Sequence, residues 1–290
     1  MKIAIIGGYG KMGRWFANFL LKDGKEVIIA GRNKGKLLEV KQQLSVEVTT
    51  NNAEAVKNAD VVLISVPIGS FDEVVKQIAP YTHPEQVIVD ITSIKAFPVE
   101  TMHKHIKTGL VLGVHPMFGP GARNIANQNF ILTPINEKER KLALKIKEYL
   151  ETRGARATLM TPQKHDEMMT IILGLSHFIA LVSADTLLSF DNLKQMKDIG
   201  GITYKVLLTL VESVISEDAE FYASLQTSLP KMAEVEKLFQ SKAKAWAELV
   251  ANKDRQQFVK RMTALKNKLE KEAPDFHKAY ENIYRIVEDL

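Results

Sequence analysis

The stretch "KIAIIGGYGKMG", residues 2–13, joins a short apolar run to a glycine-rich turn. The glycines are spaced Gly8-x-Gly10-x-x-Gly13, and a helical pattern follows them. The first glycine allows a tight turn, the second lets a pyrophosphate approach the backbone, and the third lets the helix pack close to the strand. Because the helix amino terminus then faces the phosphates, the turn predicts a dinucleotide site rather than a glycine turn without a ligand. The residues expected to contact the cofactor here are Gly8, Tyr9, Gly10, Lys11, Met12 and Gly13.

The next apolar run indicates which dinucleotide binds. "VIIAGRN", residues 27–33, ends in Gly31, Arg32 and Asn33 and carries no carboxylate. Enzymes that use NAD usually end this strand in Asp or Glu, which accepts a hydrogen bond from the ribose 2′-hydroxyl. A small residue instead makes room for a 2′-phosphate, and a guanidinium pairs with it. We therefore predict NADP rather than NAD, bound by Arg32 and Asn33; the alternative for Arg32 is a solvent-facing residue at a helix start.

Composition limits the remaining classes. The chain has 290 residues, a formal charge of +5 and no cysteine. Disulfides, thiolate chemistry and Cys-ligated metals are therefore excluded, and we expect no metal site. The lysines lie on helices that also carry glutamate, which argues against a nucleic-acid partner, although a mild positive field would attract an anionic substrate. No stretch approaches the about 20 apolar residues of a membrane span, so we expect a cytoplasmic protein without a membrane partner.

Short β-branched runs alternate with helical patterns up to about residue 160. Several runs are apolar on both faces, as the central strands of a helix-covered parallel sheet must be. The alternation predicts a Rossmann-type doubly wound, mostly parallel sheet, here assigned to a domain of residues 1–162. The expected strands are 2–7, 26–31, 46–49, 60–66, 86–91, 110–114, 129–132 and 155–159, and the clearest helices are 11–23, 34–44, 69–79 and 136–151.

After Pro162 the strand pattern disappears, and residues 163–290 predict an all-α domain. Segment 166–189 is apolar nearly all round. A helix of this kind must be covered on every side, by its own domain or by a second subunit. We therefore predict that the helical domain dimerises.

The strands of the sheet deliver polar residues to one edge. In a doubly wound sheet the carboxyl ends of the strands line the crevice where cofactor and substrate meet. Hydride transfer from a carbinol carbon needs a group that takes the hydroxyl proton, and a neutral imidazole suits that role near pH 7. Alternatively, His115 caps a turn, and Ser93 caps a helix. The residues concerned are Ser65, Val66 and Pro67 beside the cofactor, then Thr92, Ser93 and Lys95, and finally His115.

Three motifs together resemble a known family. "DITSIK" (90–95), "HPMFGP" (115–120) and "GLSHF" (174–178) are similar to segments of prephenate/arogenate dehydrogenases of the archaeal type, from tyrosine biosynthesis. The resemblance implies an NAD(P) domain, a helical dimerisation domain and an oxidative decarboxylation that leaves an aromatic ring. It also implies that His115 is the catalytic histidine, that Ser93 supports it, and that His177 lies at the substrate site. On the residues alone, His177 on its apolar helix also fits a core histidine.

The chain departs from the family at one position. The family carries an arginine that binds a substrate carboxylate, and alignment on Phe221-Tyr222-Ala223 places Ser213 there. A charged partner of this kind contributes on the order of 1.5–3 kcal/mol. We therefore expect another cation to bind the anionic substrate, and the candidates are Lys95, Arg123 and Lys205.

Two other functions remain open at this point. The "IGGYGKMG" and "AGRN" stretches also resemble deazaflavin-dependent NADP reductases, but those enzymes lack the H-P-M-F-G-P element. "GYGKMG" is similar to β-hydroxyacid dehydrogenases, but this chain lacks the G-x-x-G-x-G-x-x-x-K element of their helical domain. Ser213 in place of an arginine also fits a non-catalytic NADP-binding sensor. The presence of Ser93, His115 and His177 favours the enzyme.

Overall fold

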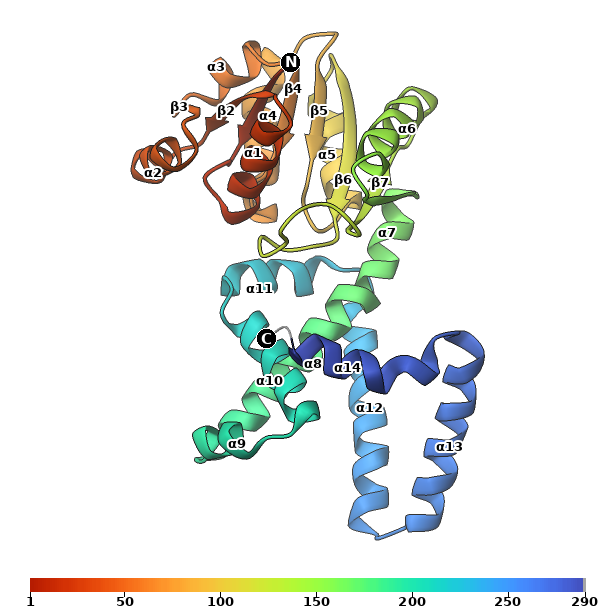
Figure 1. The fold of residues 1–290 in the computed structure, drawn as a ribbon. Helices are drawn as coiled ribbons and strands as arrows, with labels where there is room; N and C mark the ends of the chain where they lie inside the picture. The colour runs from red at the N-terminus through yellow and green to blue at the C-terminus, as the bar shows by residue number, and fades with distance from the viewer. Residues whose placement is uncertain (289–290) are drawn as a thin grey trace. The chain divides into compact units, whose positions relative to one another are not determined.

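The computed structural model describes residues 1–288, and its contacts divide the chain into two compact units that meet at Met169 and Thr170. The first unit contains an eight-stranded sheet of order β3-β2-β1-β4-β5-β6-β7-β8 (Figure 1). Strands β1 to β6 are parallel, β7 is antiparallel to β6, and β8 is parallel to β7. The mostly parallel sheet is confirmed, and each expected strand is present. The strands are β1 Lys2–Ile6, β2 Glu26–Ala30, β3 Glu47–Thr49, β4 Val61–Ile64, β5 Val87–Asp90, β6 Leu110–Pro116, β7 Asn129–Thr133 and β8 Arg156–Leu159.

Helices cover both faces of this sheet. On one face Ile5 and Ile29 pack in a core with α1 (Lys11–Lys22), α2 (Lys34–Leu44) and α6 (Glu137–Glu151). On the other face Ile6 and Ile64 pack with Phe71 and the helices α3 (Asn52–Lys57), α4 (Ile68–Ile78) and α5 (Ala96–His105). This double cover explains the continuous apolar runs, because neither face of a central strand meets water. Since β1 to β6 are parallel, their carboxyl ends lie along one edge.

The second unit is helical throughout its described residues. It begins with a π-helical turn, Thr170–Leu175, and its longest helices form the α12–α13 hairpin. Helix α10 packs against α8 and α14. The expected all-α character after Pro162 is confirmed for this part. The helices are α8 Ser176–Leu188, α9 Leu193–Ile199, α10 Ile202–Ile215, α11 Ala219–Ser228, α12 Met232–Ala251, α13 Arg255–Glu272 and α14 Ala279–Glu288, with a 3₁₀ turn at Phe276–Lys278.

Helix α7, Pro162–Met169, belongs to the first unit rather than to the helical one. Its Asp166 accepts hydrogen bonds from the backbone N–H groups of Lys95 and Ala96, at 2.7 and 2.9 Å. These bonds tie α7 to the amino terminus of α5. The units therefore separate after Met169, later than the Pro162 boundary expected from the change in pattern.

The apolar segment Pro162–Leu188 corrects one expectation. It is a helix of 27 residues whose most apolar window has a mean hydropathy of 1.9, so length and composition alone would let it cross a membrane. The expectation that no stretch approaches a membrane span is therefore wrong for this segment. Only 17% of that window is buried within the chain. Residues 162–188 therefore leave an apolar surface that the described part of the chain does not cover.

Candidate active site

The glycine-rich turn follows β1 and leads directly into α1. Gly7 has a φ of +78°, a conformation that side chains rarely adopt, and its N–H donates to Ala30 O at 2.8 Å. Helix α1 starts at Lys11 with Gly10 as its N-cap, and no side chain caps it. The first N–H groups of a helix have no partner within the helix, so this end can accept an anion. The turn predicted at residues 8–13 is therefore built as its glycines require.

The glycines of this turn determine its shape because they carry no Cβ atom. A Cβ on Gly13 would lie 2.5 Å from Gly8 Cα, which is closer than any real contact and shows why the helix can approach the strand. A Cβ on Gly10 would meet only Gly7 O, at 3.4 Å, so the backbone there borders open space. Close packing behind Gly13 and open space at Gly10 fit the two roles that a pyrophosphate site demands. The residues present therefore fit a dinucleotide.

The end of β2 carries the residues expected to select the cofactor. Arg32 is exposed, and no hydrogen bond or ion pair of its side chain is found within residues 1–288. Asn33 caps α2, because its side chain accepts from Lys36 N at 3.0 Å. The ring of Tyr9 covers Gly31, since a Cβ there would lie 2.3 Å from a ring carbon. Gly31 thus makes room for the Tyr9 ring, while the N–H groups of the Arg32 guanidinium stay available for a ligand.

Strand β4 ends against the same turn. A Cβ on Gly7 would lie 2.4 Å from Ser65 O and 2.7 Å from Val66 Cγ1. Ser65 N also donates to Ile6 O, at 2.8 Å. The segment predicted beside the cofactor, Ser65 to Pro67, therefore borders the glycine turn through backbone and apolar atoms.

His115 lies near the carboxyl end of β6 and is 4% exposed. Its Nδ1 is 2.8 Å from Nε2 of His165, in α7. Burial is the main cause that holds the pKa of His115 well below that of an exposed histidine, and the nearby charge of Lys95 lowers it further. His115 is therefore neutral near pH 7, which is the state that a general base requires.

Lys95 does not fit the substrate-binding role expected of it. Its side chain is fully buried, and Nζ donates to Asp90 Oδ1 and, at 2.9 Å, to Val114 O. Burial lowers the pKa of Lys95, and Asp90 opposes this shift. Lys95 supports the backbone next to His115 from inside the unit instead of facing a substrate.

Ser93 follows β5 at the same edge and is half-buried. Among the residues the structure describes, no hydrogen bond joins Ser93 to His115. Thr92, its neighbour, is the hydroxyl residue that turns inward, and it donates to Asp90 Oδ1 at 2.6 Å. Ser93 is not the helix cap either, because Asp166 occupies that place. Its supporting role remains a prediction.

His165 and Asp166 are the residues of this site that sequence reasoning missed. Both are buried, and His165 Nδ1 lies 2.7 Å from Asp166 Oδ1. Burial lowers the pKa of His165, although Asp166 opposes the shift. The structure places this pair directly behind His115. The only signal in the sequence was a histidine followed directly by an aspartate near the start of the predicted all-α domain.

The loop after β6 is anchored on α1. Trp15 Nε1 donates to Ala122 O at 2.6 Å, and the Trp15 and Phe118 rings meet edge-on with centroids 4.8 Å apart. Arg123 comes directly after the anchored residue and is exposed. The anchor fixes the residue before Arg123 on α1, and a substrate-binding role for Arg123 remains a prediction.

His177 and Ser213 lie in the second unit. His177 is half-buried at the start of α8 and contacts Tyr222 edge-on, with ring centroids 4.8 Å apart. Burial lowers the pKa of His177, and its buried Nδ1 has no hydrogen-bond partner among the described residues. Ser213 is exposed on α10 and donates to Leu210 O at 2.8 Å. A substrate-binding role for His177 remains a prediction.

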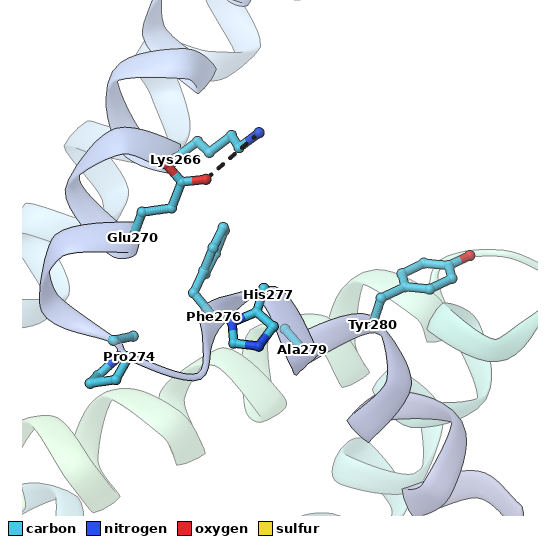
Figure 2. Close-up of a pocket in the computed structure, with 8 residues that line it drawn as sticks. Lys266, Glu270, Pro274, Phe276, His277, Ala279 and Tyr280 are labelled. Atoms are coloured by element: carbon cyan, nitrogen blue, oxygen red, sulfur yellow. Dashed lines mark ion pairs between the residues drawn. The ribbon is translucent and has the colours of Figure 1, made fainter.

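A hollow of about 490 Å³ lies between the end of α13 and the start of α14. Figure 2 shows Phe276 under the Lys266–Glu270 pair, whose charged atoms are 3.7 Å apart, while Tyr280 points away from that pair. The polar groups here are exposed and do not converge on one point. None of the residues predicted for the cofactor or substrate site lines this hollow.

A glycine turn at a helix start, an exposed arginine after β2 and a neutral buried histidine on the same sheet edge are features typical of dinucleotide-dependent dehydrogenases. Residues 16–159 match the family model "Prephenate dehydrogenase, nucleotide-binding domain", and residues 161–264 match "Prephenate dehydrogenase, dimerization domain". The chain belongs to the prephenate/arogenate dehydrogenase family.

Individual relatives agree with this assignment. The chain is 36% identical over 265 residues to a probable arogenate/prephenate dehydrogenase of Methanocaldococcus jannaschii, covering 90% of this chain and 59% of that protein. It is 31% identical over 260 residues to the T-protein of Haemophilus influenzae, covering 89% of this chain and 64% of the relative. The chain thus spans about three fifths of the length of these two curated relatives.

A solved structure shares the fold. Prephenate dehydrogenase from Aquifex aeolicus, in complex with hydroxyphenyl propionate and NAD+, superposes with a TM-score of 0.75. The identity is 20%, and the match covers 93% of this chain and 98% of that one.

Proposed function

We propose that this protein oxidatively decarboxylates prephenate or arogenate in tyrosine biosynthesis, with NADP+ as the hydride acceptor. The proposal rests on His115, a neutral buried imidazole on the same sheet edge as the glycine turn. Family membership and the probable arogenate/prephenate dehydrogenase activity of the M. jannaschii relative support the choice of substrate.

The reaction needs a base, but overall it neither releases nor takes up a proton. Bound NADP+ supplies the acceptor for the hydride that leaves ring C4. Nε2 of His115 takes the proton of the C4 hydroxyl as the carbon is oxidised. The bond between C1 and the carboxylate then breaks, its electron pair enters the ring, and carbon dioxide leaves. The proton held by His115 returns to the ring oxygen, which gives the phenol.

Turnover of the purified protein tests the proposal. Prephenate, arogenate and a panel of small hydroxyacids are each mixed with NADP+, and the absorbance of the reduced nicotinamide is followed. We expect turnover with prephenate or arogenate alone. Turnover only with a hydroxyacid would favour a different oxidoreductase. Dinucleotide binding without any turnover would favour the non-catalytic sensor.

Arg32 is proposed to bind the 2′-phosphate of NADP. Arg32→Ala is expected to raise the KM for NADP+ by about 10-fold or more, because a charge-assisted pair contributes on the order of 1.5–3 kcal/mol. The KM for NAD+, which lacks the phosphate, should change by less than about 2-fold. Lys41→Ala, at an exposed lysine in the last turn of the following helix α2, is the matched control. Equal effects of Arg32→Ala on both cofactors would contradict the assignment.

We propose that a second copy covers the apolar helix of the second unit, giving a homodimer. Ile171, Ile172 and Val182 are exposed in one copy, and the match to a dimerization domain begins at residue 161. Burial of such side chains is favourable at roughly 25 cal/mol per Å². Light scattering in detergent-free buffer should give twice the chain mass of 32.5 kDa. A monomer, or a protein recovered only with detergent, would contradict the proposal.

A further inference from the structure

Behind His115, three side chains form one chain of hydrogen bonds. His115 Nδ1 lies 2.8 Å from His165 Nε2, and His165 Nδ1 lies 2.7 Å from Asp166 Oδ1. Each of the three side chains is buried, so water does not compete for these bonds. The atom that carries the proton in each of these hydrogen bonds can be derived by starting from the last residue, Asp166.

The end of the chain is Asp166. Its Oδ1 accepts from Lys95 N–H at 2.7 Å, and its Oδ2 accepts from Ala96 N–H at 2.9 Å. Both donors belong to the amino terminus of α5, where a negative charge is favoured. Both carboxyl oxygens of Asp166 are thus engaged as acceptors of N–H groups. The bond from His165 Nδ1 to Asp166 therefore carries its proton on the histidine.

The remaining protons follow from this assignment. A neutral His165 with a proton on Nδ1 has a lone pair on Nε2. His115 Nδ1 must then donate to that lone pair, and its own Nε2 is left unprotonated. Lys95 supports the arrangement because its Nζ donates to Val114 O, which precedes His115. The opposite tautomer of His115 would place two lone pairs against each other, 2.8 Å apart and buried.

We propose that His165, held by Asp166, is a positioning residue that keeps His115 in the tautomer protonated at Nδ1, so that Nε2 is free to take the substrate proton. The inference rests on the proposed function, in which His115 is the base. His165 does not act on a substrate itself, because its two ring nitrogens face His115 and Asp166.

The tautomer can be measured directly in the full-length protein. Two-bond ¹H–¹⁵N spectra of ¹⁵N-histidine-labelled protein distinguish a protonated ring nitrogen from an unprotonated one, and His115→Asn assigns the His115 signals. We expect wild-type His115 to be protonated at Nδ1 alone. His165→Leu removes the acceptor but leaves the Asp166 bonds to Lys95 and Ala96, so His115 should then populate both tautomers.

Kinetics provide the second readout. His165→Leu should lower kcat with the proposed substrate about 100-fold and change the Kd for dinucleotide by less than about 2-fold. His165→Gln, whose amide oxygen can accept from His115 Nδ1, should recover about 10-fold of that loss. His83→Gln, at a partly exposed histidine before β5, is the matched control and should match the wild type in both measurements.

Each outcome decides the inference. A wild-type His115 protonated at Nε2 overturns it, even if neither His165 variant folds. Unchanged His115 signals in His165→Leu, together with a kcat within about 3-fold of wild type, also overturn it. If the wild type turns over neither prephenate nor arogenate, the proposed function fails, while the spectra still test the tautomer.

Discussion

His115→Asn is expected to lower kcat/KM for the proposed substrate about 10³-fold, because it removes the group that takes the hydroxyl proton. Asparagine suits this test, since its amide nitrogen can occupy the position of Nδ1 and keep the bond to His165. The variant therefore loses Nε2 while retaining a polar partner inside the buried strand. Steady-state rates and dinucleotide titration by fluorescence are the measurements.

The control separates chemistry from binding. The Kd for NADP should change by less than about 2-fold, because the glycine turn and Arg32 are untouched. His103→Asn makes the same substitution at a partly exposed histidine of α5 and should leave the rate near that of the wild type. A large loss of NADP affinity in His115→Asn would show that His115 belongs to the cofactor site instead.

The pH profile of the wild type gives an independent check of the same role. Burial and neighbouring charges lower the pKa of His115, so the neutral form persists below the pH at which an exposed histidine becomes protonated. Activity should consequently fall only as the pH drops through this depressed pKa, and the acidic limb of kcat/KM should be absent from the residual activity of His115→Asn.

The sheet could be predicted from sequence because its determinants are local. Runs such as residues 2–6 and 26–30 are apolar on both faces, and the glycines after the first run require a turn that few other residues tolerate. Parallel order then places the ends of separate strands on one edge, so His115 and the glycine turn could be assigned to the same site before any coordinates.

The interior of the site could not be predicted because its partners are distant in sequence. Asp166 caps α5 from about 70 residues away, so nothing in the spacing of "DITSIK" announces it. Lys95 follows a strand in a polar segment, which suggested an exposed cation. In the structure its side chain turns back to Asp90 at the end of that strand and is fully buried. The carboxylate at the end of an apolar strand was the signal for that pair, since a buried charge needs a partner.

The buried pair gives the largest expected effect on stability. Lys95→Met should lower the free energy of unfolding of the first unit by about 3–5 kcal/mol, because it leaves the buried Asp90 carboxylate without its cation. Oδ2 of Asp90 already lacks a hydrogen-bond partner among the described residues, so the remaining structure has no spare donor at that atom. Val114 O also loses a donor, since Nζ serves both groups.

Urea titration can follow the first unit by itself. Trp15 lies in α1, and Trp246 lies in α12, so fluorescence in a Trp246→Phe background reports the first unit alone. Lys76→Met makes the same substitution at an exposed lysine paired with Asp72, and it should cost less than about 1 kcal/mol. The comparison removes any general effect of replacing a lysine by methionine.

A second substitution separates charge from packing. Asp90→Asn combined with Lys95→Met removes both charges and keeps an oxygen that can accept from Thr92, so the pair should recover at least about half of the loss. If the double variant is as unstable as Lys95→Met, the loss comes from packing around the lysine side chain. If Lys95→Met is as stable as Lys76→Met, the buried pair does not stabilise the first unit, and the support that it gives to the backbone before His115 is not needed for folding.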